Sequence, residues 1–259
     1  MRIAIITGAS SGMGREYVRV VDQRGFDQIW AIARRRERLE ELARECETPV
    51  VPIPLNLSLP QSIDELGAHL KAACEQDGDF SVGLLVSCAG FAKLGTFAEV
   101  TREETDKMIA VNCTAMVDIT QLVVPYMTSG SRILELVSMA SFQPLPHLNI
   151  YAATKAFMLS YTRSLRWELA GTGIHATAVC PGWVRTEFQK VSEDTRASKA
   201  VRHQQPSISP HRVAVWSLFV SRINFPVATC GIYSWVTRVF SKFIPNPIVM
   251  ALWELIRRI

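Results

Sequence analysis

Residues 3–14 read Ile-Ala-Ile-Ile-Thr-Gly-Ala-Ser-Ser-Gly-Met-Gly, a short apolar run that passes directly into a loop of small residues. The run 3–7 predicts a strand, and residues 12–24 predict the helix after it. Glycine is needed where the chain turns tightly and must approach a phosphate group without a Cβ in the way. The N–H groups at the start of the helix would then face the anion. This stretch therefore predicts a dinucleotide-binding loop.

The same alternation of apolar runs and amphipathic segments continues along the chain. Strands alternating with helices of this length indicate right-handed βαβ units and a parallel sheet, and apolar strands fit a sheet covered on both faces. Pro52 and Pro54 indicate a strand at an edge. We expect one α/β domain over residues 1–259, with a doubly wound parallel sheet of about seven strands. The predicted strands are 3–7, 28–33, 50–55, 82–87, 132–138 and 174–180, and the predicted helices are 12–24, 36–47, 60–76, 103–126 and 149–170.

Composition excludes several classes of protein. The 259 residues are 48% hydrophobic and 20% charged, with a net charge of +4. This mild, scattered charge argues against a nucleic-acid partner. The six cysteines show no metal-ligand spacing, so we expect buried free thiols and no metal. Residues 1–6 are too short an apolar run for a secretion signal, and no uninterrupted apolar stretch approaches membrane-spanning length. We expect a soluble, cytoplasmic protein.

The end of the second predicted strand bears on the choice of cofactor. An NAD site usually has an acidic residue about 20 residues after the glycines, where it binds the ribose 2′-hydroxyl. Here Ala33 is followed by Arg34, Arg35 and Arg36, and Arg15 lies beside the glycine loop. Cations in place of an acid favour a 2′-phosphate. The pattern therefore favours NADP(H) and leaves NAD(H) open, although a solvated first helical turn would also explain Arg35 and Arg36.

Polar residues with the chemistry of proton transfer follow in the second half of the chain. Tyr151 and Lys155 are four residues apart, on one face of the helix predicted to begin near Asn149. A nearby ammonium, together with the positive ring of a nicotinamide, favours the phenolate and brings a tyrosine's pKa toward working pH. Ser138 ends a strand, where parallel sheets bind ligands, and could hold a substrate oxygen. Asn112, in mid-helix, could bend the helix and hold a water that passes protons to Lys155.

These motifs together resemble the short-chain dehydrogenase/reductase family, a Rossmann fold, from residue 3 to about residue 190. The resemblance rests on the order and spacing of residues 7–14, the Asn112 segment, Ser138, residues 151–155 and Pro181-Gly-Trp-Val-Arg-Thr186. It implies that Asn112, Ser138, Tyr151 and Lys155 form a catalytic tetrad. It also implies that Lys155 binds the nicotinamide ribose and Thr186 the carboxamide. The residues expected at the cofactor are Gly8, Ser10, Ser11, Gly12, Met13, Gly14, Arg34, Arg35, Asn56, Leu57, Ala89, Gly90, Tyr151, Lys155, Pro181, Gly182, Val184 and Thr186.

Three positions depart from the family pattern. Ser87-Cys88-Ala89-Gly90 stands where Asn-Asn-Ala-Gly is common, Asn56 replaces a frequent Asp, and Ser141 replaces a frequent Gly. The first two put cofactor affinity in doubt more than chemistry. None of the three removes a catalytic group.

The resemblance implies a hydride transfer between nicotinamide and a hydrophobic ketone or secondary alcohol, with Tyr151 as proton donor. A ketosteroid or a 3-oxoacyl thioester would suit the apolar candidates for the pocket. The alternatives are a non-catalytic NADP(H) sensor, and an epimerase or dehydratase with no net cofactor oxidation. The candidate pocket residues are Phe91, Met139, Phe142, Leu145, Trp183, Phe188 and the polar segment 186–208.

The tail over residues 234–259 is apolar and resembles tails in the branch with long-chain 3-oxoacyl reductases and hydroxysteroid dehydrogenases. Asn246-Pro247 predicts a helix start, as Ser209-Pro210 does earlier. Packing on the parent domain, a contact in a homodimer or homotetramer, and docking on a membrane surface compete as roles for the tail. Packing is the favoured role and membrane docking the least favoured.

Overall fold

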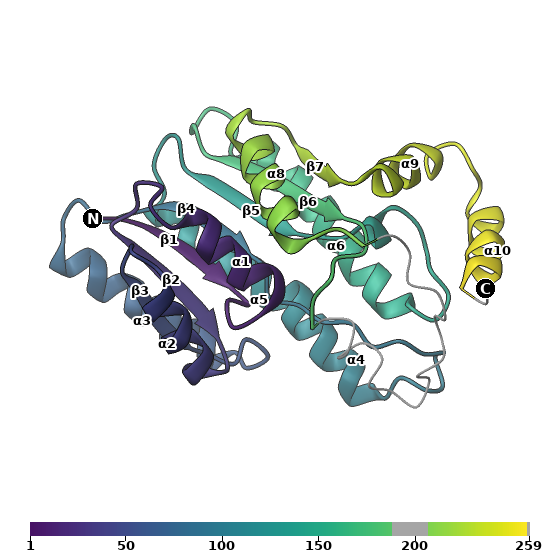
Figure 1. Cartoon of the computed structure of the whole chain (residues 1–259), viewed down its shortest axis with the longest axis horizontal. Coiled ribbons are helices and arrows are strands. Elements are labelled where there is room, and N and C mark those ends of the chain that lie inside the picture. Colours follow the sequence, from purple (N-terminus) through teal and green to yellow (C-terminus); the bar gives the residue numbers. More distant parts are fainter. Residues whose placement is uncertain (188–206, 258–259) are drawn as a thin grey trace.

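A single seven-stranded parallel sheet forms the centre of the molecule (Figure 1). The computed structural model describes residues 1–187 and 207–257. In β1, Ile3 and Ile5 join the core on one face of the sheet, while Ala4 and Ile6 join the core on the other. The order β3-β2-β1-β4-β5-β6-β7 confirms the predicted doubly wound sheet. The strands are β1 Arg2–Thr7, β2 Gln28–Ala33, β3 Val50–Pro54, β4 Ser81–Ser87, β5 Arg132–Leu136, β6 His175–Pro181 and β7 Val227–Cys230.

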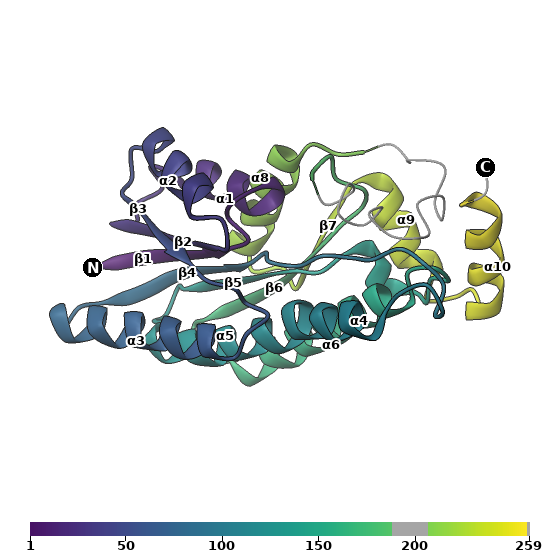
Figure 2. The same ribbon diagram turned by 90° about the horizontal axis from the view of Figure 1, so that it is seen from below.

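Helices cover both faces of this sheet (Figure 2). On one face lie α1 (Gly12–Val21), α2 (Arg36–Glu45) and α8 (Pro210–Arg222). On the other lie α3 (Gln61–Gln76), α4 (Arg102–Ile109), α5 (Ala115–Val123) and α6 (Asn149–Glu168). Each layer contributes its own buried apolar cluster. The strands between the layers are therefore apolar on both sides, as parallel strands must be.

The differences from the predicted elements have local causes. The helix predicted over 103–126 is interrupted by a π-helical segment, Ala110–Thr114, and ends in a 3₁₀ turn, Val124–Tyr126. A π segment inserts a residue into the helical ladder and often marks a functional site. The seventh strand, β7, was not placed by the sequence, because four residues are too few for a clear periodicity. The proline-containing β3 is an edge strand, as predicted.

The stretch Arg102–Tyr126 is also the one helical stretch of the described residues with the length and apolar content to cross a membrane. Met116, Ile119 and Val123 from this stretch are buried in the core beside the sheet. Its apolar composition is therefore explained by packing inside the domain.

The cysteines only partly match the expectation of buried free thiols. All six are free. Cys113, Cys180 and Cys230 are buried, but Cys74 is exposed near the end of α3. The prediction of burial is therefore wrong for Cys74, because the position falls on the solvent face of an amphipathic helix.

The tail forms two helices, α9 (Ile232–Phe240) and α10 (Asn246–Ile256), with α10 at the far end of the molecule from the N-terminus (Figure 1). Only the second of these was predicted. Trp253 attaches α10 to the domain: it is 5% exposed, and its Nε1 donates to the carbonyl of Pro146 at 2.8 Å. Glu254 lies beside His147, with Oε1 3.5 Å from Nε2. These contacts favour packing as the role of the tail.

Replacing Trp253 with Ala should release α10, because a buried aromatic side chain contributes about 3–5 kcal/mol. We expect trypsin to cleave after the exposed Lys242, between α9 and α10, at least about tenfold faster. Leu252→Ala is the control, since Leu252 lies on the same helix and is 48% exposed. Equal cleavage rates for the two variants would show that Trp253 does not hold the helix.

Candidate active site

A cavity of about 600 Å³ lies at the carboxyl edge of the sheet, lined by residues from the loops that follow β1 to β6. The chain reverses its winding direction between β1 and β4, and ligands of open α/β sheets bind at such a point. Every residue expected at the cofactor lines this cavity. So do Ser138, Tyr151 and Lys155 of the expected tetrad, whereas Asn112 does not.

The glycine loop forms one wall of the cavity. Gly8 and Gly12 have φ values of +68° and +54°, in the left-handed region that favours glycine. A Cβ on Gly14 would lie 2.3 Å from the carbonyl oxygen of Gly8, so no other residue fits there. Ser11 caps α1 without a side-chain hydrogen bond, which leaves the first N–H groups of the helix available. This cradle fits the pyrophosphate of a dinucleotide.

Thr7 joins the glycine loop to the next strand of the sheet. Its Oγ1 accepts hydrogen bonds from the N–H groups of both Cys88 and Ala89, each at 2.9 Å. Ser87, at the end of β4, donates instead to the buried carboxyl of Glu135 at 3.2 Å. The departure from the Asn-Asn-Ala-Gly pattern thus leaves the contact between β1 and β4 intact.

The arginines after β2 differ in whether their side chains contact the glycine loop. Arg34 is exposed, whereas Arg35 donates to Ser10 of the glycine loop at 3.1 Å and to Glu187 at 3.2 Å. Arg38 also binds Glu187, at 2.7 Å. Among these arginines, Arg35 is therefore the one that contacts the glycine loop. Because α2 starts at residue 36, the side chain before it is directed toward the strand ends.

Arg15 does not contribute to the cavity, although it follows the glycine loop in sequence. Its guanidinium forms salt bridges with Glu41 and Glu45 of α2, at 3.3 and 2.5 Å. The expectation that Arg15 adds positive charge at the cofactor is wrong, because position 15 lies on the face of α1 that packs against α2.

Helix α6 presents Tyr151 and Lys155 one turn apart at the floor of the cavity. The Lys155 ammonium donates to the carbonyl of Leu136 at 2.7 Å and lies 5.8 Å from the centre of the Tyr151 ring. Ser138 follows β5, and its side chain is hydrogen-bonded to Tyr151. The N–H of Ala140 donates to the Ser138 Oγ at 3.1 Å and fixes its position. The structure thus brings these three predicted residues together.

Asn112 lies behind the cavity rather than in its wall. It is fully buried in the π-helical segment, accepts from the N–H of Phe91 at 3.0 Å and donates to the carbonyl of Phe91 at 2.9 Å. It also donates to Thr154 Oγ1 at 3.2 Å. A Cβ on Gly90 would lie 3.1 Å from Asn112 Oδ1 and 3.5 Å from Lys155 Nζ. The side-chain amide of Asn112 therefore links the loop after β4 to α6.

The pKa of Tyr151 reflects the burial of its side chain. Burial raises it to about 12, and the hydrogen bond from Ser138 opposes this rise only in part. Burial also lowers the pKa of Lys155. In the protein alone, removal from water dominates and Lys155 is directed to the Leu136 carbonyl, so the lowering expected from the lysine together with a nicotinamide ring stays a prediction for the cofactor complex.

Most of the other residues that line the cavity are apolar, but Lys93 and Lys107 line it as well. Phe91, Met139, Leu145 and Trp183 line it as predicted. Phe142 instead packs against the core beneath the sheet, and Phe188 and residues 189–206 lie outside the described residues. Sequence reasoning missed Leu148 and above all Trp253, because nothing in the sequence shows where a helix 100 residues later docks. Glu187, from the predicted segment 186–208, also lines it, and the lining residues not predicted include Ala92, Leu94, Leu148 and Trp253.

Residues 2–197 match the profile of the short chain dehydrogenase family. The chain belongs to this family of oxidoreductases. It is 34% identical over 224 residues to sulfoacetaldehyde reductase 2 of Chromohalobacter salexigens, covering 82% of this chain and 85% of the relative. It is 31% identical over 196 residues to a very-long-chain 3-oxoacyl-CoA reductase of Phaeosphaeria nodorum, covering 73% of this chain and 56% of that protein. The solved closed form of a serine dehydrogenase complexed with NADP+ has a TM-score of 0.76 and 29% identity, covering 89% of this chain and 93% of that one.

This short-chain dehydrogenase also carries a buried acid beside the site that sequence reasoning did not single out. Glu135 of β5 is 1% exposed and accepts a hydrogen bond from the Thr120 hydroxyl at 2.8 Å. Its Oε2 has no hydrogen-bond partner within the described chain. Burial raises its pKa from 4.5 to about 7, while Thr120, Ser87 and the charge of Lys155 lower it. The sequence signal that could have identified Glu135 is an acidic residue among the apolar residues of a predicted strand.

The folded protein holds the Glu135 proton more tightly than the unfolded chain does. The contribution of Glu135 to the free energy of unfolding is therefore complete below pH 4.5 and declines as the pH rises through 7. Between pH 5 and pH 8, the free energy of unfolding of the wild type should fall by up to about 3 kcal/mol because of Glu135. We expect Glu135→Gln, which keeps a hydrogen-bond acceptor, to remove this fall. Denaturant unfolding at several pH values measures this. The exposed Glu37→Gln is the control and should keep the wild-type dependence. A parallel pH dependence in Glu135→Gln would contradict the assignment.

Proposed function

We propose that this protein is an NADPH-dependent oxidoreductase that interconverts a hydrophobic ketone and its secondary alcohol, with Tyr151 as general acid and base. One observation carries the proposal: Tyr151, hydrogen-bonded to Ser138 and one helical turn from Lys155, shares a cavity with the glycine cradle. The alternative of a non-catalytic NADP(H) sensor has no supporting feature, because the proton-transfer groups are all in place.

The residues of the cradle and of the strand ends would hold the dinucleotide. The N–H groups at the start of α1 face the pyrophosphate, and Arg35 lies beside Ser10, where a 2′-phosphate needs a cation. Ala33 offers no carboxylate to a 2′-hydroxyl. These features support NADP(H) over NAD(H), and the NADP+ complex of the serine dehydrogenase is consistent with them. When bound, the cofactor supplies or accepts the hydride.

The chain's own residues then handle the carbonyl oxygen and its proton. The hydroxyls of Ser138 and Tyr151 donate to the ketone oxygen and stabilise the negative charge that develops on it. The Tyr151 phenol is protonated at neutral pH, as any phenol with a pKa of 10 or above is, and can give that proton to the oxygen; burial raises its pKa further, to about 12. Lys155, held by the Leu136 carbonyl, remains beside the phenol as the source of charge and of the next proton. Asn112 positions α6 against the loop after β4.

The apolar walls support a bulky hydrophobic substrate. Phe91, Leu148, Trp183 and Trp253 supply large apolar surfaces to the cavity that holds Ser138 and Tyr151, although Lys93 and Lys107 also line it. The 3-oxoacyl-CoA reductase of Phaeosphaeria nodorum is a relative named for a long acyl substrate. Sulfoacetaldehyde, named for the relative from Chromohalobacter salexigens, is a small anion and serves as the contrasting substrate. Ketosteroids and 3-oxoacyl thioesters remain the two classes to compare.

Self-association is part of the proposal. Trp167 of α6 is 82% exposed, and Trp216 and Phe219 of α8 are 47% and 50% exposed. Large aromatic side chains on the outer helices favour burial against a second copy of the chain. A homodimer or homotetramer would cover these faces.

Tyr151→Phe should lower kcat/KM by at least about a hundredfold, because the proton donor is lost while the ring still fills its place. The consumption of NADPH, followed by absorbance with each substrate class, measures this. The cofactor Kd should stay unchanged. Tyr126→Phe is the control, since Tyr126 packs against Phe80 away from the cavity. Cofactor binding without turnover of any substrate by the wild type would instead favour the sensor.

Arg35→Ser should raise the KM for NADPH by roughly tenfold or more, because a charge-assisted hydrogen bond is worth about 1.5–3 kcal/mol. The KM for NADH should change much less, since NADH has no 2′-phosphate. Arg36→Ser is the matched control, because Arg36 is exposed and its ion-pair partner is Glu40 on the same helix. If both cofactors weakened equally, Arg35 would be holding the loop rather than a 2′-phosphate.

A further inference from the structure

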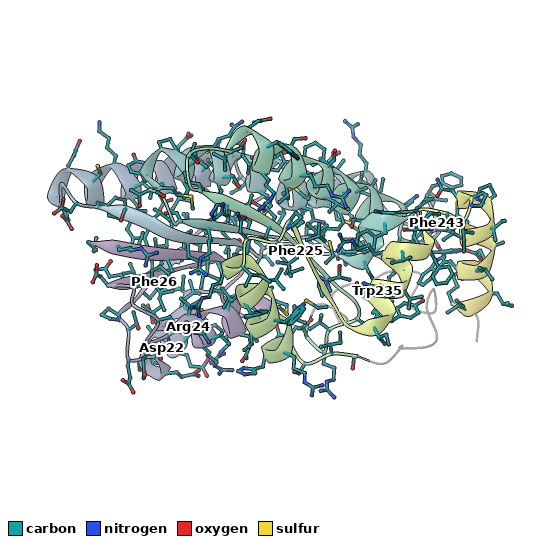
Figure 3. All side chains as sticks on the ribbon, turned by 90° about the horizontal axis from the view of Figure 1, so that it is seen from above. Asp22, Arg24, Phe26, Phe225, Trp235 and Phe243 are labelled. Atoms are coloured by element: carbon teal, nitrogen blue, oxygen red, sulfur yellow. The ribbon has the colours of Figure 1, made fainter. Side chains whose placement is uncertain are left out.

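A second hollow, of about 440 Å³, lies between the ends of α1 and α8 and is lined by Arg24, Arg132 and Arg222. Phe26 and three aliphatic side chains complete its walls. Figure 3 shows Arg24 and Phe26 near the starts of the first strands, far from Trp235 and Phe243 of the tail. The hollow thus faces the amino edge of the sheet, opposite the catalytic cavity.

Three separate elements bring these arginines together. Arg24 lies in the turn after α1, Arg132 is the first residue of β5, and Arg222 is the last residue of α8. Arg2, at the start of β1, adds a fourth cation nearby, with its guanidinium 5.0 Å from the centre of the Phe26 ring. A cluster assembled from four distant parts of the chain is a feature of the fold and not of one charged segment.

The arginines of this hollow have no acidic partners. Within the described chain, Arg24, Arg132 and Arg222 form neither an ion pair nor a side-chain hydrogen bond, in contrast to Arg38, which binds Glu187 at 2.7 Å. Burial lowers the pKa of Arg132, and the neighbouring cations Arg2, Arg222 and Arg24 lower it further. Like charges in a half-buried position are unfavourable unless an anion accompanies them.

Helix dipoles explain only part of this arrangement. Arg24 and Arg222 follow or end helices, where a cation compensates the negative end of the dipole. Arg132 begins a strand and gains nothing from a dipole, and compensation of two helix ends does not require a shared hollow. The convergence of the three side chains therefore needs another reason.

We propose that this hollow is a binding site for a small organic polyanion carrying phosphate or carboxylate groups. Guanidinium groups bind both kinds of oxyanion with paired hydrogen bonds, which suits three arginines around one hollow. Phe26 and Leu218 provide an apolar wall for the organic part of the ligand. Arg132 in the hollow and Leu136 in the catalytic cavity are four residues apart on β5, about 13 Å at the rise of a parallel strand, so the ligand does not compete with the dinucleotide.

Titration calorimetry with pyrophosphate and with citrate at constant ionic strength tests the proposal and distinguishes the two kinds of oxyanion. The glycine loop can also bind anions, so variants of the full chain assign the site. Whichever of the two probes binds this hollow more tightly is the preferred probe. We expect Arg222→Gln and Arg24→Gln each to raise its Kd for the hollow at least tenfold, while its Kd for any other anion site stays unchanged. Both side chains are exposed, so both variants should fold like the wild type, which circular dichroism checks. Arg36→Gln, an exposed arginine of α2, is the matched control and should bind both probes like the wild type.

Thermal unfolding gives an independent readout. The preferred probe should raise the Tm of the wild type, with a smaller rise in Arg222→Gln, because only the folded state presents the site. Without the probe, Arg222→Gln should be no less stable than the wild type, since one repelling charge is removed. Wild-type protein that binds neither probe, or affinities for both probes that are unchanged in Arg222→Gln and Arg24→Gln, would overturn the proposal.

Discussion

The Thr7 hydroxyl, which accepts from the N–H groups of Cys88 and Ala89, is the contact on which the active-site geometry depends. It joins β1 to β4 at the point where the order of the sheet reverses. On one side of this contact the chain enters the glycine loop and α1. On the other side it continues through Gly90 to Phe91, whose backbone is held by Asn112. The cofactor cradle and the proton-transfer groups are therefore linked through two fully buried side chains, Thr7 and Asn112, whose hydrogen bonds to the backbone set their separation.

Burial determines the chemistry that the catalytic groups can perform. Removal from water keeps the Tyr151 phenol protonated and lowers the pKa of the Lys155 ammonium. The same low-polarity surroundings strengthen each remaining hydrogen bond, including that of Lys155 to the Leu136 carbonyl. Burial also raises the pKa of the nearby Glu135 carboxyl, to about 7. The protein alone thus presents a protonated phenol, and a positive charge in addition to that of Lys155 would be needed to favour the phenolate for the reverse reaction.

The sequence predicted those features that depend on local pattern and on motif order. The alternation of strands and helices, the loop at Gly8–Gly14 and the meeting of Ser138, Tyr151 and Lys155 follow from periodicity, from glycine geometry and from the family resemblance. Features set by side-chain direction could not be predicted. Arg15 follows the glycine loop and Arg35 follows β2, but α1 turns Arg15 toward Glu45, whereas Arg35 lies beside Ser10 of the loop. The burial that raises the pKa of Tyr151 likewise depends on packing of the whole cavity.

One residue of the cavity wall comes from a part of the chain outside the family match. The family match ends at residue 197 and includes every residue expected to act on the carbonyl or the cofactor. Trp253, which lines the substrate side of the cavity, lies more than fifty residues later, on a helix attached to the domain chiefly through that side chain and the contact of Glu254 with His147. The catalytic core can therefore remain fixed while changes in α10 reshape the apolar wall. In this chain a change on α10 can therefore alter the wall of the cavity without moving Ser138, Tyr151 or Lys155.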